Sequence, residues 1–387
     1  MGKRARQRLP RAGRRSSALH AGLIVVAGMV SYGNSLSGPF VFDDRNAIVE
    51  NISLRSFDTV LSQAPNSPIA GRPLVALSFA LNHRVGGLEV RGYHLANIGI
   101  HLCTALLLFG VARRTLLMPR MKGLYSADDA TGPAFAIALL WTVHPLNTEA
   151  VDYITERTES LMALMFVLTL YASIRALAVN GPFQSSRVPK FQSLWQSIAV
   201  LACGLGMACK ESMVTAPVVV MVYDRVFVFS GVREAARNRS RLYGGLALTA
   251  LVLAYLIVPG PRSGSAGFSA GVAPWTYLVN QTVMIVRYLR LTFWPTSLVI
   301  NYGPPLSLTL QQVLPQAAAV GALLMFTLLA LVRWRTVGFL GAWAFLTLAP
   351  TSSIVPIATE VGAERRMYLP LMALVAAVVL AVPASLP

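Results

Sequence analysis

Long apolar stretches recur along the chain and are separated by short polar breaks. Most approach the length of roughly 17–25 residues that a helix needs to cross a bilayer. The pattern therefore predicts an all-α polytopic membrane protein. Ten segments are predicted as transmembrane helices, near 18–36, 94–113, 131–147, 158–179, 194–209, 211–229, 243–259, 312–332, 337–356 and 367–384.

One further apolar segment, 273–295, contains Arg287 and Arg290. If it spanned the membrane, the loop that holds Arg333 would move to the opposite side. We therefore expect a re-entrant or interfacial helix, whose arginines can reach the lipid headgroups. Depending on this segment, the protein has about 10–11 membrane helices.

Composition agrees with this class. Of the 387 residues, 55% are hydrophobic and 13% are charged, whereas a soluble domain carries about 25% charge. The net charge of +17 would suggest nucleic acid as the partner of a soluble protein. Here the bases fall between the apolar segments, so membrane topology explains them and no nucleic-acid partner is expected.

The basic loops set the topology, because positive loops stay on the cytoplasmic side. Residues 1–17 form a basic tail, which we read as cytoplasmic rather than as part of a cleaved signal peptide, since no convincing small-residue cleavage site follows. Residues 18–387 form the membrane domain. With the tail inside, the extracytoplasmic loops are 37–93, 148–157, 260–311 and 357–366, and these loops hold most of the acids.

Two adjacent acids, Asp43 and Asp44, lie just beyond the first apolar segment. A carboxylate at the membrane rim can act as a general base, and neighbouring carboxylates push each other's pKa apart. The alternative is a solvated loop pair or a helix cap.

Three further groups of polar residues lie near the predicted rim. His94, Asn97 and His101 share one helix face, and a polar seam inside the bundle is favoured there over metal ligands; we predict no metal site. Asp152, Glu156 and Glu159 are spaced as one acidic face of a helix. Arg72 is a candidate for a phosphate or for the Asp43–Asp44 pair, unless it only extends to the headgroups.

Arg365 and Arg366 lie outside, against the positive-inside trend. A lipid phosphate is the simplest partner for two such guanidinium groups. Lys210 and Glu211 lie in a tight turn between two predicted transmembrane segments. They either mark only the boundary of the membrane segments or support the site of the acids and arginines.

Together these segments resemble the transmembrane-and-TPR protein O-mannosyltransferase family and related bacterial membrane proteins, all of C-type glycosyltransferase architecture. The matching stretches are Phe40–Asp44, Arg72–Leu74, Gly92–His94, His144–Glu149, Arg157–Glu159, Lys210–Glu211, Tyr288–Pro295, Pro350–Pro356 and Glu364–Pro370. The chain differs in having Glu156 where the family usually has glycine. It also ends at Pro387, before the TPR domain that usually follows.

The resemblance implies transfer of a monosaccharide, mannose or another hexose, from a polyprenyl-phosphate carrier to a hydroxyl acceptor. The acceptor would be Ser/Thr of a protein, or a glycan, on the extracytoplasmic face. It implies no cofactor beyond the lipid-linked donor, and it leaves a metal requirement open. A bacterial inner membrane is preferred over the endoplasmic reticulum. The alternatives are a flippase for lipid-linked sugars and an inactive membrane scaffold.

The same resemblance assigns roles to particular residues. Asp43 or Asp44 would be the catalytic base. Arg365, Arg366, Arg72 and Arg157 would bind the donor phosphate. The supporting residues would be Glu364, His94, His144, Glu149, Lys210 and Glu211.

Overall fold

Helices account for the regular structure in the described part of the chain, which comprises residues 11–65, 67–121, 129–177, 188–258 and 266–381 of a computed structural model. The first ten residues of the predicted basic tail, and residues 260–265 of the predicted third outside loop, fall outside these ranges. Five helices are long and apolar enough to cross a membrane, and four shorter apolar helices accompany them. The prediction of an all-α polytopic membrane protein is therefore confirmed.

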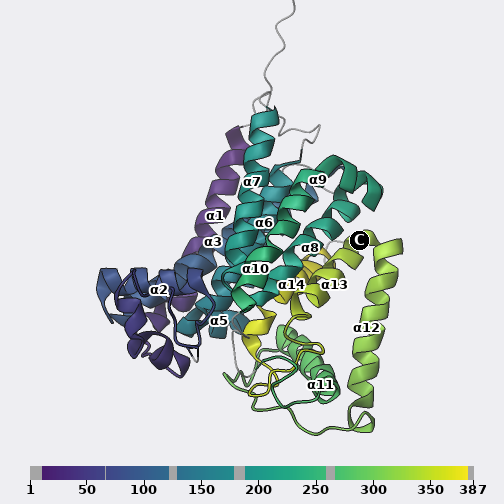
Figure 1. Cartoon of the computed structure of the whole chain (residues 1–387). Helices are drawn as coiled ribbons and strands as arrows, with labels where there is room; N and C mark the ends of the chain where they lie inside the picture. Colours follow the sequence, from purple (N-terminus) through teal and green to yellow (C-terminus); the bar gives the residue numbers. More distant parts are fainter. Residues whose placement is uncertain (1–10, 66, 122–128, 178–187, 259–265, 382–387) are drawn as a thin grey trace, which may run out of the picture.

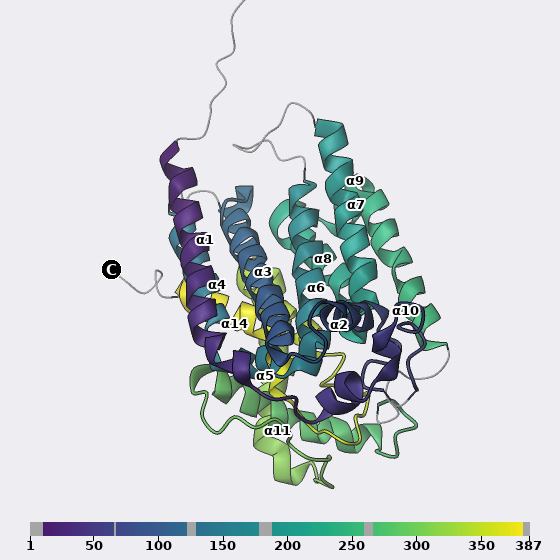
Figure 2. The ribbon, with the colours of Figure 1, turned by 90° about the vertical axis from the view of Figure 1, so that its left-hand side faces the viewer.

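All ten predicted segments contain helix. The helices in these segments are α1 (Arg11–Tyr32), α3 (Val90–Leu116), α4 (Thr131–Thr142), α6 (Arg157–Arg175), α7 (Val188–Met207), α8 (Ala216–Tyr223), α9 (Val232–Leu248) with α10 (Ala250–Ile257), α12 (Leu314–Arg333), α13 (Arg335–Leu348) and α14 (Pro370–Ala381). Figures 1 and 2 show most of them running side by side, with α12 at the outer edge of the group.

Several of these helices are shorter than predicted, and proline is the main reason. α4 ends at Thr142 rather than near 147, because His144-Pro145 follows and a residue before proline disfavours helical backbone. α13 likewise ends at Leu348, just before Ala349-Pro350. These early ends leave loops and short helical turns at one end of the bundle.

Glycine permits the closest helix contact. α12 and α13 form a tight hairpin, and a Cβ placed on Gly338 would lie 2.3 Å from the backbone nitrogen of Leu331. No other residue fits without a shift, as is common where membrane helices approach closely.

Two helices lie across the bundle instead of along it. Figure 2 shows α2 (Pro73–Gly86) and α11 (Pro274–Phe293) at the lower end, where α1 ends and α3 begins. Residues 38–72, 143–156 and 349–369 gather at this same end, which we call the loop end. The crosswise position of α11 agrees with the interfacial helix expected for 273–295.

The topology can be tested by cysteine labelling. In a Cys103→Ala background, we expect cysteines at the exposed positions Ser56, Ser307 and Thr359 to react with an impermeant thiol reagent in intact cells. Ser56 and Thr359 lie in the loop end, and Ser307 lies in the loop after α11. The basic tail predicts all three to be outside. A cysteine at Ser240, in α9, should react only after permeabilisation. Labelling of Ser240→Cys in intact cells would reverse the predicted orientation.

Candidate active site

Asp43 and Asp44 follow α1 at the loop end, and their side chains have opposite environments. Asp44 is fully buried. Its Oδ1 accepts hydrogen bonds from the backbone N–H of Thr155 at 2.8 Å and from the Thr155 hydroxyl at 2.5 Å, and its Oδ2 accepts one from the N–H of Val41 at 3.0 Å. Asp44 therefore fixes the loop, whereas Asp43 is exposed and can reach a ligand.

The backbone turns sharply just before the exposed acid. Phe42 has a φ of 43°, a left-handed conformation that a bulky side chain rarely adopts. Strain of this kind costs about 1–3 kcal/mol and persists only where neighbouring contacts impose it. The contacts here are those of Asp44 with Thr155 and of the Asp43 N–H with the Tyr153 hydroxyl, at 3.0 Å.

The surroundings of Asp43 raise its pKa above the usual value. Although the residue is exposed to solvent, partial desolvation of its carboxylate is the largest cause, and the charge of Glu156 adds to it. Arg365, a hydrogen bond from Tyr153, and Arg72 oppose the shift. A carboxylate with a raised pKa is the better proton acceptor at neutral pH, because the ideal base has a pKa near the working pH.

The acids downstream do not form the single helical face that their spacing predicts. Tyr153 has extended backbone, with φ −80° and ψ 109°, and separates α5 (Thr148–Asp152) from the short 3-10 turn Ile154–Glu156. That part of the prediction is wrong. Glu156 contacts Arg365, and Glu159 pairs instead with Lys210 at 2.5 Å.

Arg365 joins the last loop to the segment after α4. Its guanidinium pairs with Glu149, with Glu156 at 3.1 Å and with Glu360 at 2.5 Å. Its backbone N–H also donates to Glu149 at 2.8 Å. Three carboxylates around one arginine leave an excess of negative charge, and burial raises the pKa of Glu149 to about 7 even though Arg365 lowers it.

Two other arginines predicted to bind phosphate already donate their hydrogen bonds to oxygen atoms of the protein. Arg157 is 1% exposed. It donates to Asn97 at 2.7 Å, to Asn82 at 2.6 Å and to the backbone oxygens of Ser78 and Tyr93. This burial favours a structural role that ties α2, α3 and α6 together, and phosphate binding by Arg157 stays a prediction.

Arg366 is also buried, at 5% exposure. It donates to the hydroxyl of Tyr277 and to the carbonyls of Thr351, Val361 and Glu360. These bonds hold the last loop against α11. Phosphate binding by Arg366 likewise remains untested.

Of the four arginines predicted to bind phosphate, Arg72 makes the fewest hydrogen bonds to the protein. It is half-buried, and its Nη1 donates to the carbonyl of Pro68 at 2.7 Å. Its Nε is buried and has no hydrogen-bond acceptor among the described residues. A buried donor without an acceptor is costly, so an anionic ligand near Asp43 would satisfy it.

Two of the residues predicted to support the site bond to the backbone of other segments, and their supporting role in a site stays a prediction. Glu364 accepts hydrogen bonds from the N–H of Val299 at 2.7 Å and from the Tyr302 hydroxyl at 2.9 Å. His144 lies 3.0 Å from the carbonyl of Thr292, near the end of α11. Glu211 begins the 3-10 turn that precedes α8.

The polar face of α3 is the seam that the sequence favours. His94 contacts the carbonyl of Gly38, Asn97 donates to the carbonyls of Val151 and Ile154, and His101 bonds to the Tyr368 hydroxyl and the Thr142 carbonyl. In the described ranges, no group of acids, histidines and cysteines could hold a metal ion.

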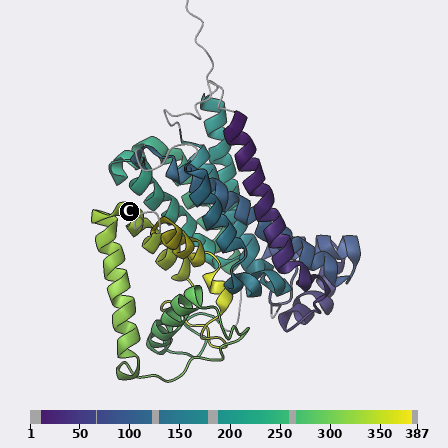
Figure 3. The ribbon, with the colours of Figure 1, turned by 180° about the vertical axis from the view of Figure 1, so that it is seen from behind.

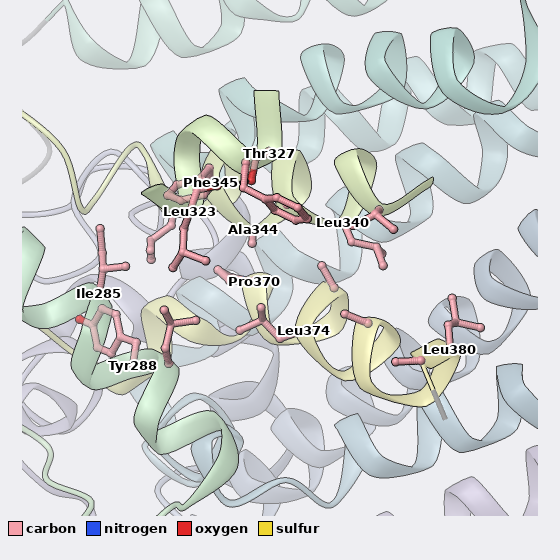
Figure 4. A pocket seen from close by; sticks show the side chains of 18 of the residues that line it. Ile285, Tyr288, Leu323, Thr327, Leu340, Ala344, Phe345, Pro370, Leu374 and Leu380 are labelled. Atoms are coloured by element: carbon pink, nitrogen blue, oxygen red, sulfur yellow. Dashed lines mark hydrogen bonds between the residues drawn. The ribbon is translucent and has the colours of Figure 1, made fainter. Parts of the chain in front are cut away.

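An apolar groove of about 810 Å³ lies between α11, α12, α13 and α14, and the hydropathy pattern alone did not indicate it. Figure 4 shows its lining, which includes Tyr288, Thr327, Leu340, Phe345 and Leu374. Met367, beside Arg366, also lines it. The groove therefore reaches the last loop, and its other end reaches Leu380 near the far end of α14 (Figure 3 shows these helices from behind).

The sequence is related to known proteins over most of its length, although no protein-family model matches it. Over 291 residues, 71% of this chain, it is 30% identical to protein O-mannosyl-transferase Tmtc2 of Drosophila melanogaster. It is 33% identical over 56% of its length to protein O-mannosyl-transferase TMTC1 of Homo sapiens. The chain is a homologue of the protein O-mannosyl-transferases.

This chain spans only a part of these protein O-mannosyl-transferases, since the matches cover 29% and 25% of the two relatives. Among solved structures, it is similar to ArnT from Cupriavidus metallidurans bound to undecaprenyl phosphate. That likeness has a TM-score of 0.48 and 15% identity, and it covers 96% of this chain and 60% of ArnT.

The role of Arg157 can be measured separately from ligand binding. Arg157→Met removes the donor for several buried acceptors, each of which costs about 1–3 kcal/mol when left unsatisfied. We expect a lower thermal unfolding midpoint in detergent. Arg72→Met is the matched control and should lower the midpoint less, because Arg72 is half-buried and has fewer partners. An unchanged midpoint for Arg157→Met would contradict the structural role.

Proposed function

We propose that this protein is an integral-membrane glycosyltransferase of the C type. It transfers a hexose, for which mannose is the first candidate, from a polyprenyl-phosphate carrier to a hydroxyl acceptor. The transfer takes place on the extracytoplasmic face, and the leading candidate for the acceptor is Ser/Thr of a protein. The observation that carries this proposal is the exposed Asp43 carboxylate at the loop end of a membrane bundle, where the charges of Arg72 and Arg365 act on it. The relationship to protein O-mannosyl-transferases supports it.

In the proposed reaction Asp43 accepts the proton of the acceptor hydroxyl. The freed oxygen attacks the anomeric carbon from the side opposite the phosphate, so the configuration inverts. The bond between that carbon and the phosphate oxygen breaks, and its electron pair leaves with the polyprenyl phosphate. A phosphate leaves without needing a proton, so the reaction needs a base and a cationic group but no general acid.

We assign the arginines different roles according to the hydrogen bonds and ion pairs that each makes with the protein. Arg72 has an unsatisfied Nε–H and is the first candidate for the phosphate. Arg365 is held by three carboxylates, and it contributes positive charge near Asp43. The groove between α11 and α14 has the size and the apolar lining for a segment of the polyprenyl tail, which would place its phosphate beside the last loop.

Replacing the base tests the proposal directly. We expect Asp43→Asn to lower transfer from polyprenyl-phosphate mannose by at least ~10²-fold, the scale of general-base loss, at an unchanged unfolding midpoint. Asp44→Asn should lower the midpoint as well, because three hydrogen bonds end on that buried carboxylate. Full activity of Asp43→Asn would favour a flippase or an inactive scaffold.

The rate should also depend on pH through Asp43. A base acts only when deprotonated, so turnover should rise with pH through the pKa of Asp43, which its surroundings raise above that of an ordinary aspartate. The acid limb of the turnover profile should therefore lie above the usual aspartate range near ~3.9. A flat profile across that range would contradict the assignment.

Arg72 offers a test of donor binding. We expect Arg72→Gln to raise the KM for polyprenyl-phosphate mannose and to lower turnover by about 10²-fold, the typical loss for a group that stabilises developing charge. Arg72→Lys should retain donor binding better than turnover, because lysine keeps the charge but lacks the bidentate geometry. Arg84→Gln, at an exposed position of α2, is the control. Normal kinetics of Arg72→Gln would contradict phosphate binding by Arg72 and leave Arg365 as the next candidate.

A further inference from the structure

Tyr153 contacts the turn that carries the exposed acid on two sides. Its hydroxyl accepts a hydrogen bond from the N–H of Asp43 at 3.0 Å, and its own hydrogen is then free to bond to the Asp43 carboxylate. Its ring meets the ring of Phe42 edge-on, with the centroids 6.3 Å apart. Tyr153 is 7% exposed, whereas Phe42 is 65% exposed.

The break between α5 and α6 makes these contacts possible. Tyr153 is extended there, and Thr155 follows two residues later. Thr155 holds Asp44 through its N–H and its hydroxyl, while Tyr153 holds Asp43. Two residues of one break thus fix two consecutive acids of a loop that lies 110 residues away in the sequence.

The contacts also explain how the Phe42 conformation persists. A φ of 43° at a phenylalanine is unfavourable and needs an external restraint. Asp44 anchors the turn on its buried side. Without Tyr153, the exposed side would lose its hydrogen bond and its ring contact, and the Asp43 carboxylate would be free to move.

We propose that Tyr153 is a positioning residue: its hydroxyl and ring fix the Phe42–Asp43 turn so that the Asp43 carboxylate faces the acceptor hydroxyl. This inference rests on the proposed transferase function. It concerns a residue that the sequence motifs did not single out.

The charged groups around Asp43 make the role measurable. Glu156 raises the pKa of Asp43, whereas Arg365, Arg72 and the Tyr153 hydrogen bond lower it, and the buried Asp44 adjoins it in the chain. Removing the phenolic hydroxyl takes away one of the lowering interactions. The pKa of Asp43 should therefore rise in a Tyr153→Phe variant, while the other groups stay in place.

Tyr153→Phe is the decisive variant. We expect its turnover at neutral pH to fall about tenfold, because the base no longer faces the acceptor hydroxyl. We expect its KM for polyprenyl-phosphate mannose to change less than about twofold, and its acid limb to move to higher pH, because one interaction that lowers the pKa of Asp43 is lost. Raising the pH should restore part of the rate. A turnover and an acid limb that both match the wild type would overturn the proposal, because the hydroxyl would then neither place the Asp43 carboxylate nor bond to it.

The matched control is Tyr243→Phe, at the far end of the bundle. That hydroxyl also donates to an aspartate carboxylate, Asp224, at 2.6 Å, so the same bond type is lost away from the site. Its turnover profile should match the wild type. A shifted profile in this variant as well would mean that the shift reports general loosening of the protein.

A second readout does not need activity. Carbodiimide labelling of Asp43, followed by peptide mass spectrometry across pH, reports when the carboxyl is protonated. Labelling of Tyr153→Phe should extend to higher pH than in the wild type, even if no transfer is detected. An inactive wild type would then count against the transferase, whereas unshifted labelling would count against the role of Tyr153.

Discussion

The ion cluster around Arg365 is the interaction on which the loop end depends. One guanidinium contacts Glu149, Glu156 and Glu360, and its backbone N–H binds Glu149 again. It thereby ties the last loop to the segment after α4. Breaking a buried ion pair costs more than the pair contributes, because the remaining charge is left desolvated. The cluster thus fixes the relative position of two segments 216 residues apart.

The segment after α4 then positions the first loop. Thr155 and Tyr153 hold Asp44 and Asp43, while Arg157, one helical turn further on, fastens α2 to α3. Three loops from distant parts of the sequence converge in this way. A site assembled from such loops can hold strain, here at Phe42, because the segment after α4 restrains both the first loop and the last loop.

The excess of carboxylates has a chemical consequence. Burial alone would protonate some of these acids, as the raised pKa of Glu149 indicates. In such surroundings a phosphate must compete with carboxylates for guanidinium groups, so a donor such as Arg72, with a free buried Nε–H, matters more than the number of arginines.

The sequence by itself determined the membrane class, the approximate helices and the acid pair, because hydropathy over a bilayer's thickness and charge between spans are local properties of the chain. It could not distinguish Asp43 from Asp44, which differ only in their contacts with Thr155 and Tyr153. It also read Asp152, Glu156 and Glu159 as one helix face, since the extended backbone at Tyr153 carries no proline or glycine signal. Which arginines are buried and which acid is exposed was decided by tertiary structure, because burial and hydrogen bonding depend on partners far away in the chain.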